Sequence, residues 1–158
     1  IAGGTSPFSG LLKELSRFMD SGPDTDREKE EQEKRVFFLE NIDEGVKNDI
    51  LAACDIFTTP SGFESFGITI LEAWRHRKPV VACRIHATMS LIEEYETGLL
   101  VDYKNPLELA EALKELMVDA ELRKKLGQKG FEKLTNHYSR QVVGKQYHEF
   151  YREVLGRG

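Results

Sequence analysis

The stretch from residue 55 to residue 76 constrains the fold most, because it joins three patterns in a fixed order. Residues 55–59 are a short apolar run, which is typical of a buried strand. Pro60, Ser61 and Gly62 then form a loop, and apolar residues recur at helical spacing from about Phe66 to His76. This order places a helix N-terminus just beyond the end of a strand. Free N–H groups and the helix dipole attract anions there.

Strand and helix patterns alternate along the rest of the chain. Further apolar runs at 36–39, 80–83 and 99–101 are continuous, as strands buried on both faces should be. Helical patterns lie at 46–54, 106–117 and 121–134, and a last helix is expected to start after Ser139 as its N-cap. We expect residues 84–88 to form a loop and 89–95 a short helix. The pattern predicts an α/β fold, a Rossmann-like parallel sheet with helices on both faces, ending in a helical run.

In such sheets ligands bind beyond the carboxyl ends of the strands. That rule selects residues 39–42, 58–67 and 83–88, three segments that each follow a strand. We therefore expect them to converge on one crevice. Within the third segment, His86 is a candidate for a donor or acceptor contact, and Arg84 is the best remaining candidate for a phosphate partner.

Composition excludes several classes of function. The 158 residues carry a net charge of −5, which argues against a nucleic-acid partner held mainly by phosphate contacts. The two cysteines have no metal-type spacing, so no metal site is expected, and they suit a reducing, cytoplasmic compartment. Residues 1–4 look like the end of a strand running into a glycine turn. We therefore expect residues 1–158 to be a single domain, a fragment that lacks its first strand unit.

The loop and helix of the central stretch suit a nucleoside diphosphate. A phosphate could approach the N–H groups of Gly67, Ile68 and Thr69, because glycine has no side chain to block it. Glu72 lies one turn further on, about 5.4 Å along the helix, and a carboxylate there could accept both hydroxyl protons of a ribose. Glu64 would lie near the phosphates or what they carry. By spacing alone, the reading of both glutamates as solvated surface residues is slightly favoured.

The motif around these glutamates resembles that of a known family. Glu64, seven residues and Glu72, preceded by Pro60-Ser61, resemble the E-x7-E motif of retaining glycosyltransferases with the GT-B fold. The family is glycosyltransferase family 4, also called glycosyl transferases group 1. Segments similar to other family motifs lie at 53–57, 71–73, 78–82, 97–101 and 121–127. The chain looks like the C-terminal, donor-binding domain of such an enzyme.

The resemblance implies a role for each matching residue. Glu64 would be the catalytic residue at the donor sugar, and Glu72 would bind the ribose hydroxyls. The backbone amides of Phe66, Gly67 and Ile68, with Thr69, would hold the diphosphate, and Leu39 would meet the base. Ser65 departs from the glycine usual in the family, and residues 84–89 depart from its G-G-x-P-E loop. The resemblance implies neither a cofactor nor a metal.

At the level of the protein, the resemblance implies retaining transfer of a sugar from a nucleotide-diphosphate sugar to an unknown acceptor, by a glycosyltransferase (hexosyltransferase) of carbohydrate biosynthesis. The acceptor-binding N-terminal domain would be missing, along with any peripheral membrane contact it makes. The family's phosphate-neutralising Arg and Lys would precede Ile1, so we expect the isolated fragment to be inactive. The alternatives are a nucleotide-binding regulatory module without catalysis, or another GT-B enzyme such as a sugar-nucleotide epimerase.

Overall fold

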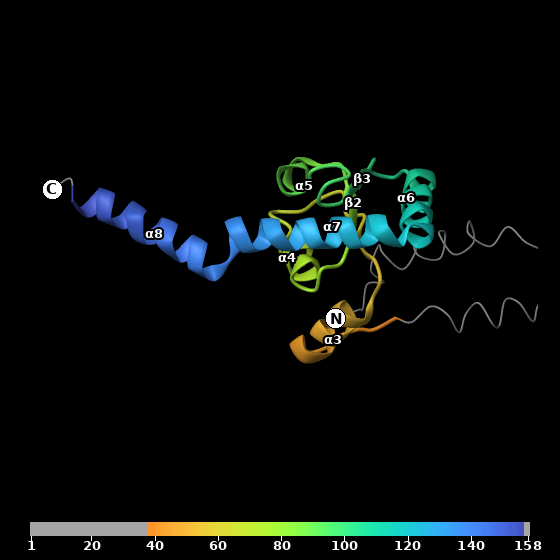
Figure 1. The fold of residues 1–158 in the computed structure, drawn as a ribbon, viewed down its shortest axis with the longest axis horizontal. Coiled ribbons are helices and arrows are strands. Elements are labelled where there is room, and N and C mark those ends of the chain that lie inside the picture. Colours follow the sequence, from red (N-terminus) through yellow and green to blue (C-terminus); the bar gives the residue numbers. More distant parts are fainter. Residues whose placement is uncertain (1–37, 157–158) are drawn as a thin grey trace, which may run out of the picture. The chain divides into compact units, whose positions relative to one another are not determined.

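The computed structural model describes residues 38–156, which fall into two units, one up to Asp49 and one from Ile50 onward (Figure 1). Helix α3 (Glu44–Ala53), which runs across the boundary at Asp49, begins with Asp43 as its cap, since the Asp43 carboxylate accepts from the Val46 N–H at 2.9 Å. Phe38 and Leu39 lie outside any helix or strand. The strand expected over 36–39 is therefore wrong at its last two residues, and 36 and 37 lie outside the described residues. An apolar run forms a strand only where another strand pairs with it, and none pairs with Phe38 or Leu39 among the described residues.

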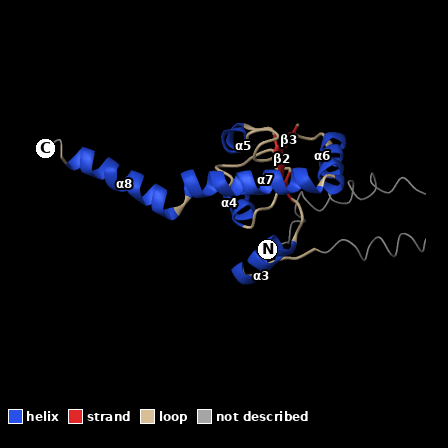
Figure 2. Cartoon of the chain, in the orientation of Figure 1, coloured by secondary structure: helices blue, strands red, loops and turns tan. Residues whose placement is uncertain are grey.

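The second unit contains a three-stranded parallel sheet with helices in the crossovers. Its strands are β1 (Phe57–Thr59), β2 (Val80–Cys83) and β3 (Leu99–Val101), in the order β1-β2-β3. Thr58 is opposite Val81, and Ala82 is opposite Leu100. Helix α4 (Ile68–Arg75) connects β1 to β2, and helix α5 (His86–Leu91) connects β2 to β3. The predicted α/β fold with a parallel sheet is confirmed (Figure 2).

The chain ends in the expected helical run. Helices α6 (Pro106–Val118) and α7 (Ala120–Lys133) are followed by a π-helical turn, η1 (Leu134–Tyr138), and by helix α8 (Arg140–Leu155). Side chains of Asn105, Asp119 and Ser139 cap the three α-helices by accepting backbone N–H bonds. Ser139 is thus the N-cap that its position predicts.

The core forms around Trp74, which is completely buried on α4. Its indole N–H donates to the carbonyl oxygen of Thr97 at 3.0 Å, so the one polar group of the ring is satisfied. Gly130 of α7 faces the same ring so closely that a Cβ there would lie 2.2 Å from a ring carbon. All four residues of β2 are buried, which agrees with their continuous apolar run.

Helix α5 begins three residues earlier than expected. Residues 84–88 were expected to be a loop, but the helix runs from His86 to Leu91. Its start depends on Thr88, whose hydroxyl accepts from the Ile85 N–H and donates to the Cys83 carbonyl. A helix start is usually marked in the sequence by a polar residue at the cap position. This chain has Ile85 there, so the sequence gives little indication that a helix begins at His86.

None of the helices within residues 38–156 combines the length and the apolar character needed to span a bilayer.

Candidate functional site

The tip of α4 is built on Gly67. We expected the helix to start near Phe66, but it starts at Ile68, with Gly67 before it at φ 95° and ψ 43°. This left-handed conformation favours glycine. A Cβ at Gly67 would also lie 2.8 Å from a methyl carbon of Leu91 on α5. The expected start was wrong because a glycine in this conformation, and no polar side chain, ends the loop.

Unsatisfied donors are exposed at this tip. Within the described part of the chain, the N–H groups of Phe66, Gly67, Ile68 and Thr69 have no protein acceptor. Ile68 and Thr69 are exposed, and Gly67 is buried. Free N–H groups at a helix N-terminus form an anion-binding site. The four residues expected to hold a diphosphate therefore lie together, and their N–H groups have no acceptor among the described residues.

A groove of about 360 Å³ lies beside this tip. One wall is the loop of residues 62–66, which includes Glu64, and the other is the start of α5, formed by Ile85, His86, Ala87 and Ser90. Glu64 is partly buried, and its carboxylate accepts from the Ser65 N–H at 3.1 Å. Two of the three segments predicted to converge on a crevice therefore do so. The second wall belongs to a helix and not to a loop, however, and Ser90 in it lies beyond the predicted segment.

Glu72 lies one helical turn beyond Ile68, as its spacing predicts. It is partly buried on α4 and does not line the groove that contains Glu64. The two carboxylates therefore occupy different places, one in the groove and one along the helix. A ligand that contacts both must have two separate polar groups.

Leu39 belongs to the first unit, where it is 58% exposed. Its expected contact with a nucleotide base stays a prediction. Phe63 lines the groove, and its side chain is 83% exposed.

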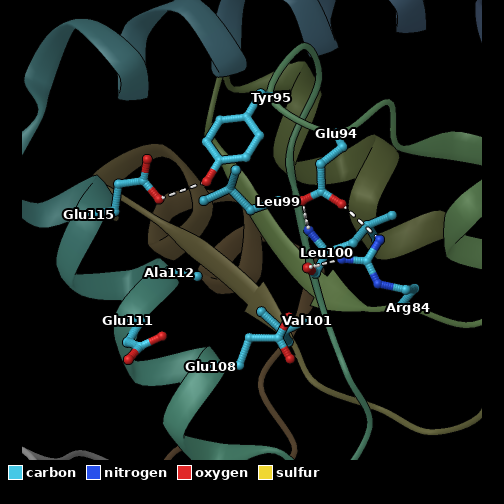
Figure 3. Close-up of a pocket in the computed structure, with 10 residues that line it drawn as sticks. All are labelled: Arg84, Glu94, Tyr95, Leu99, Leu100, Val101, Glu108, Glu111, Ala112 and Glu115. Atoms are coloured by element: carbon cyan, nitrogen blue, oxygen red, sulfur yellow. Dashed lines mark hydrogen bonds and ion pairs between the residues drawn. The ribbon is translucent and has the colours of Figure 1, made fainter.

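Arg84 does not line this groove, because its guanidinium is bound elsewhere. It donates to Glu94 and to the Leu100 carbonyl, each at 2.9 Å (Figure 3). It also pairs with Asp102 at 3.4 Å. The hydrogen bond to Glu94 raises the pKa of Arg84. Glu94 also accepts from the Leu100 N–H at 2.9 Å. This pair therefore satisfies the backbone groups on the outer edge of β3, which would otherwise be free to pair with another strand.

These contacts form one end of a second hollow, of about 410 Å³, between β3 and α6. Figure 3 shows Glu108, Glu111 and Glu115 along its α6 wall, with Glu115 accepting from the Tyr95 hydroxyl at 3.2 Å. The charge of Glu115 raises the pKa of Tyr95. An acidic wall of this kind repels anions, so the groove beside α4 is the candidate site for an anionic ligand.

No group of three or more His, Cys, Asp or Glu side chains in the described ranges could hold a metal ion. The two cysteines, Cys54 and Cys83, are unpaired thiols. Burial raises the pKa of each.

One residue beside the site was missed by sequence reasoning. Tyr103 lies just after β3, and its ring contacts Gly62 in the groove wall. The rule that ligands bind beyond the carboxyl ends of strands would have included residues 102–105 as well.

Comparison with known proteins shows the family of this chain. The family model described as "Glycosyl transferases group 1" matches residues 22–133, and the chain belongs to this family. A curated relative, D-inositol 3-phosphate glycosyltransferase of Corynebacterium glutamicum, is 38% identical over 113 residues, which are 70% of this chain and 27% of the relative. The match covers 27% of that relative and 28% of a second one, the lipopolysaccharide core biosynthesis glycosyltransferase LpsE of Rhizobium meliloti. The chain therefore spans little more than a quarter of the length of each.

Solved structures show the same fold. The C-terminal domain of a group 1 glycosyl transferase (LpcC) from Francisella tularensis superposes with a TM-score of 0.60 and 28% identity, over 73% of this chain and 66% of that one. Anabaena Alr3699/HepE, solved in complex with UDP-glucose, gives a TM-score of 0.64 at 24% identity, over 80% of this chain and 36% of that one. The second unit thus has the fold of a glycosyltransferase domain of the GT-B type.

Proposed function

We propose that this chain binds a nucleotide-diphosphate sugar as the donor for glycosyl transfer with retention of configuration, as in glycosyltransferase family 4. The diphosphate binds the N–H groups at the tip of α4, and the ribose lies one turn along the helix at Glu72. The sugar occupies the groove beside Glu64.

The observation that carries this proposal is the position of Phe66. Its N–H is one of the free donors at the helix tip, and the same residue lines the groove that contains Glu64. An anion site and a groove with a carboxylate are therefore continuous, as a ligand with a diphosphate joined to a sugar requires. The UDP-glucose complex of Alr3699/HepE, a protein of the same fold, supports this choice of ligand.

In the reaction, the bond between the anomeric carbon and the diphosphate oxygen breaks, and the electron pair stays on that oxygen. The oxygen of the acceptor hydroxyl forms the new bond to carbon, and its proton passes to the leaving diphosphate. The N–H groups at the α4 tip stabilise the charge that develops on the leaving diphosphate. Glu64 contacts hydroxyl groups of the sugar and holds it in the groove.

The residues lining the groove include neither Lys nor Arg. Because the described lining of the groove supplies no cation to neutralise the leaving diphosphate, we expect the 158-residue chain to bind donor without turnover. Release of free nucleoside diphosphate from a nucleotide sugar by the purified chain would contradict this expectation.

Calorimetry tests the proposal directly. The chain is titrated with UDP-glucose, GDP-mannose and ADP-glucose, and with UDP, GDP and ADP alone. We expect saturable binding of one nucleotide class and weaker binding by Gly67→Ala, which places a Cβ against Leu91 and strains the left-handed backbone. Gly144→Ala is the matched control, because nothing lies within 4 Å of a Cβ there. If no nucleotide or nucleotide sugar binds at millimolar concentration, the proposal is wrong.

A further inference from the structure

The loop that contains Glu64 is held at both ends by aromatic rings from distant parts of the sequence. At one end, the ring of Tyr103 lies against Gly62, and at the other Phe66 meets the ring of Tyr138 edge-on, with centroids 5.9 Å apart. Between these contacts, the loop's hydrogen bond at Glu64 is local, from the Ser65 N–H. The place of Glu64 in the groove therefore depends on how firmly the two ends are held.

The contact at Gly62 is unusually close. A Cβ built on Gly62 would lie 2.3, 2.4 and 2.7 Å from three atoms of the Tyr103 ring. Gly62 does not have a positive φ, so its backbone would accept alanine without strain. Glycine is needed at this position because the ring occupies the space of a side chain.

Tyr103 is itself fixed by a well-bonded turn. The turn closes with the Asn105 N–H donating to the Asp102 carbonyl at 3.2 Å, and Glu108 accepts from the Asp102 N–H at 2.7 Å. The Lys104 ammonium lies over the Tyr103 ring, 5.3 Å from its centroid. A ring carried by a hydrogen-bonded turn thus packs against a loop that has few hydrogen bonds of its own.

We propose that Tyr103 is a positioning residue that, through Gly62, holds Glu64 at the donor sugar. The inference rests on the proposed function, because it assigns the groove to the sugar. The prediction is specific, since the Tyr103 ring contacts Gly62 in the groove wall, and Gly62 precedes Gly67 at the helix tip by five residues. Loss of the Tyr103 ring should weaken binding of the sugar and leave binding of the diphosphate unchanged.

The test compares Tyr103→Ala and Tyr103→Phe in the whole 158-residue chain. The probes are UDP-glucose with UDP, and GDP-mannose with GDP. For the pair that binds, we expect Tyr103→Ala to weaken the nucleotide sugar about tenfold and the nucleoside diphosphate less than about twofold. Tyr103→Phe keeps the ring and should restore wild-type affinity. Tyr147→Ala, an exposed tyrosine on α8, is the matched control and should change neither.

A double-mutant cycle adds a second measurement. Gly62→Ala removes the same contact by pushing the ring away, so the double variant should be no worse than either single variant. Losses that add would show that the two residues act separately and would overturn the proposal. Equal weakening of sugar nucleotide and diphosphate by Tyr103→Ala would overturn it as well.

NMR order parameters of residues 62–65 separate failure of this inference from failure of the proposed function. They should fall in Tyr103→Ala and stay at wild-type values in Tyr103→Phe, with no ligand present. If the wild-type chain binds none of the probes, the donor-site proposal fails, and these order parameters alone decide whether Tyr103 holds the loop. Unchanged order parameters in Tyr103→Ala overturn the positioning role.

Discussion

The indole N–H of Trp74 donates to the backbone carbonyl of Thr97 across 3.0 Å, and both residues are buried. This bond ties helix α4, whose tip forms the candidate site, to the turn just before β3. Because the carbonyl is buried, it has no water to replace the indole. The position of α4 therefore depends on a polar contact inside the core.

Trp74→Phe should lower the free energy of unfolding by about 2–4 kcal/mol, because it leaves the Thr97 carbonyl unsatisfied and opens space in the core. Urea unfolding followed by circular dichroism measures the change. Phe63→Ala is the control at an 83% exposed ring and should stay within about 0.5 kcal/mol of wild type. A Trp74→Phe variant as stable as wild type would show that the bond does not contribute.

Two helical glycines should respond to alanine with opposite signs. A Cβ at Gly127 of α7 would lie 2.0 Å from the backbone carbonyl oxygen of Arg77, so Gly127→Ala should destabilise the fold by about 2 kcal/mol or more. A Cβ at Gly144 of α8 meets nothing within 4 Å, so Gly144→Ala should stabilise by up to about 1 kcal/mol. Thermal unfolding of both variants measures the two changes in stability. A change of the same sign in both variants would contradict these packing assignments.

Stability should fall as pH rises through the alkaline range. Burial raises the pKa of Cys54 and Cys83, so the folded state keeps these protons to higher pH than the unfolded state. Their contribution is complete below the unfolded thiol pKa and is lost as pH rises through the folded pKa. Urea midpoints between pH 7 and pH 10 should therefore decline less in a Cys54→Ala/Cys83→Ala variant than in wild type. An equal decline in the two proteins would argue against the thiols as the cause.

Removing the carboxylate of Glu94 should expose the edge of β3. Glu94→Ala frees the Leu100 N–H and removes one of the two acidic partners of Arg84, whereas Glu94→Gln can still accept the backbone bond. We expect Glu94→Ala to self-associate at high concentration through the freed edge. Sedimentation velocity on both variants gives the answer, and a monomeric Glu94→Ala at every concentration would be evidence against edge protection.

The sequence predicts elements well wherever their boundaries carry a local signal. β2 and β3 have the predicted bounds, Pro106 starts α6, and Ser139 caps α8. The start of α5 was missed because its capping depends on the hydroxyl of Thr88, which lies three residues after the cap position at Ile85.

The site was predictable in its parts and less so in its assembly. Gly67, Glu64 and residues 85–87 are close in sequence to strand ends, so a general rule for parallel sheets selected them, although not as a helix. The contact between Gly62 and Tyr103 joins residues far apart in the chain, and no local pattern reports it. The roles of Glu64, Glu72 and the residues at the helix tip stay predictions.

The central claim is that Glu72 binds the ribose of a nucleoside diphosphate held at the tip of α4. Calorimetry with UDP and 2′-deoxy-UDP, or with the guanine pair if the chain selects guanine, tests it most directly. The wild-type chain should bind the ribonucleotide about tenfold more tightly than the deoxy analogue, because Glu72 accepts from the 2′-hydroxyl. In Glu72→Ala the two nucleotides should bind equally and weakly. If Glu72→Ala keeps the wild-type preference, the ribose lies elsewhere and the proposed donor site is wrong.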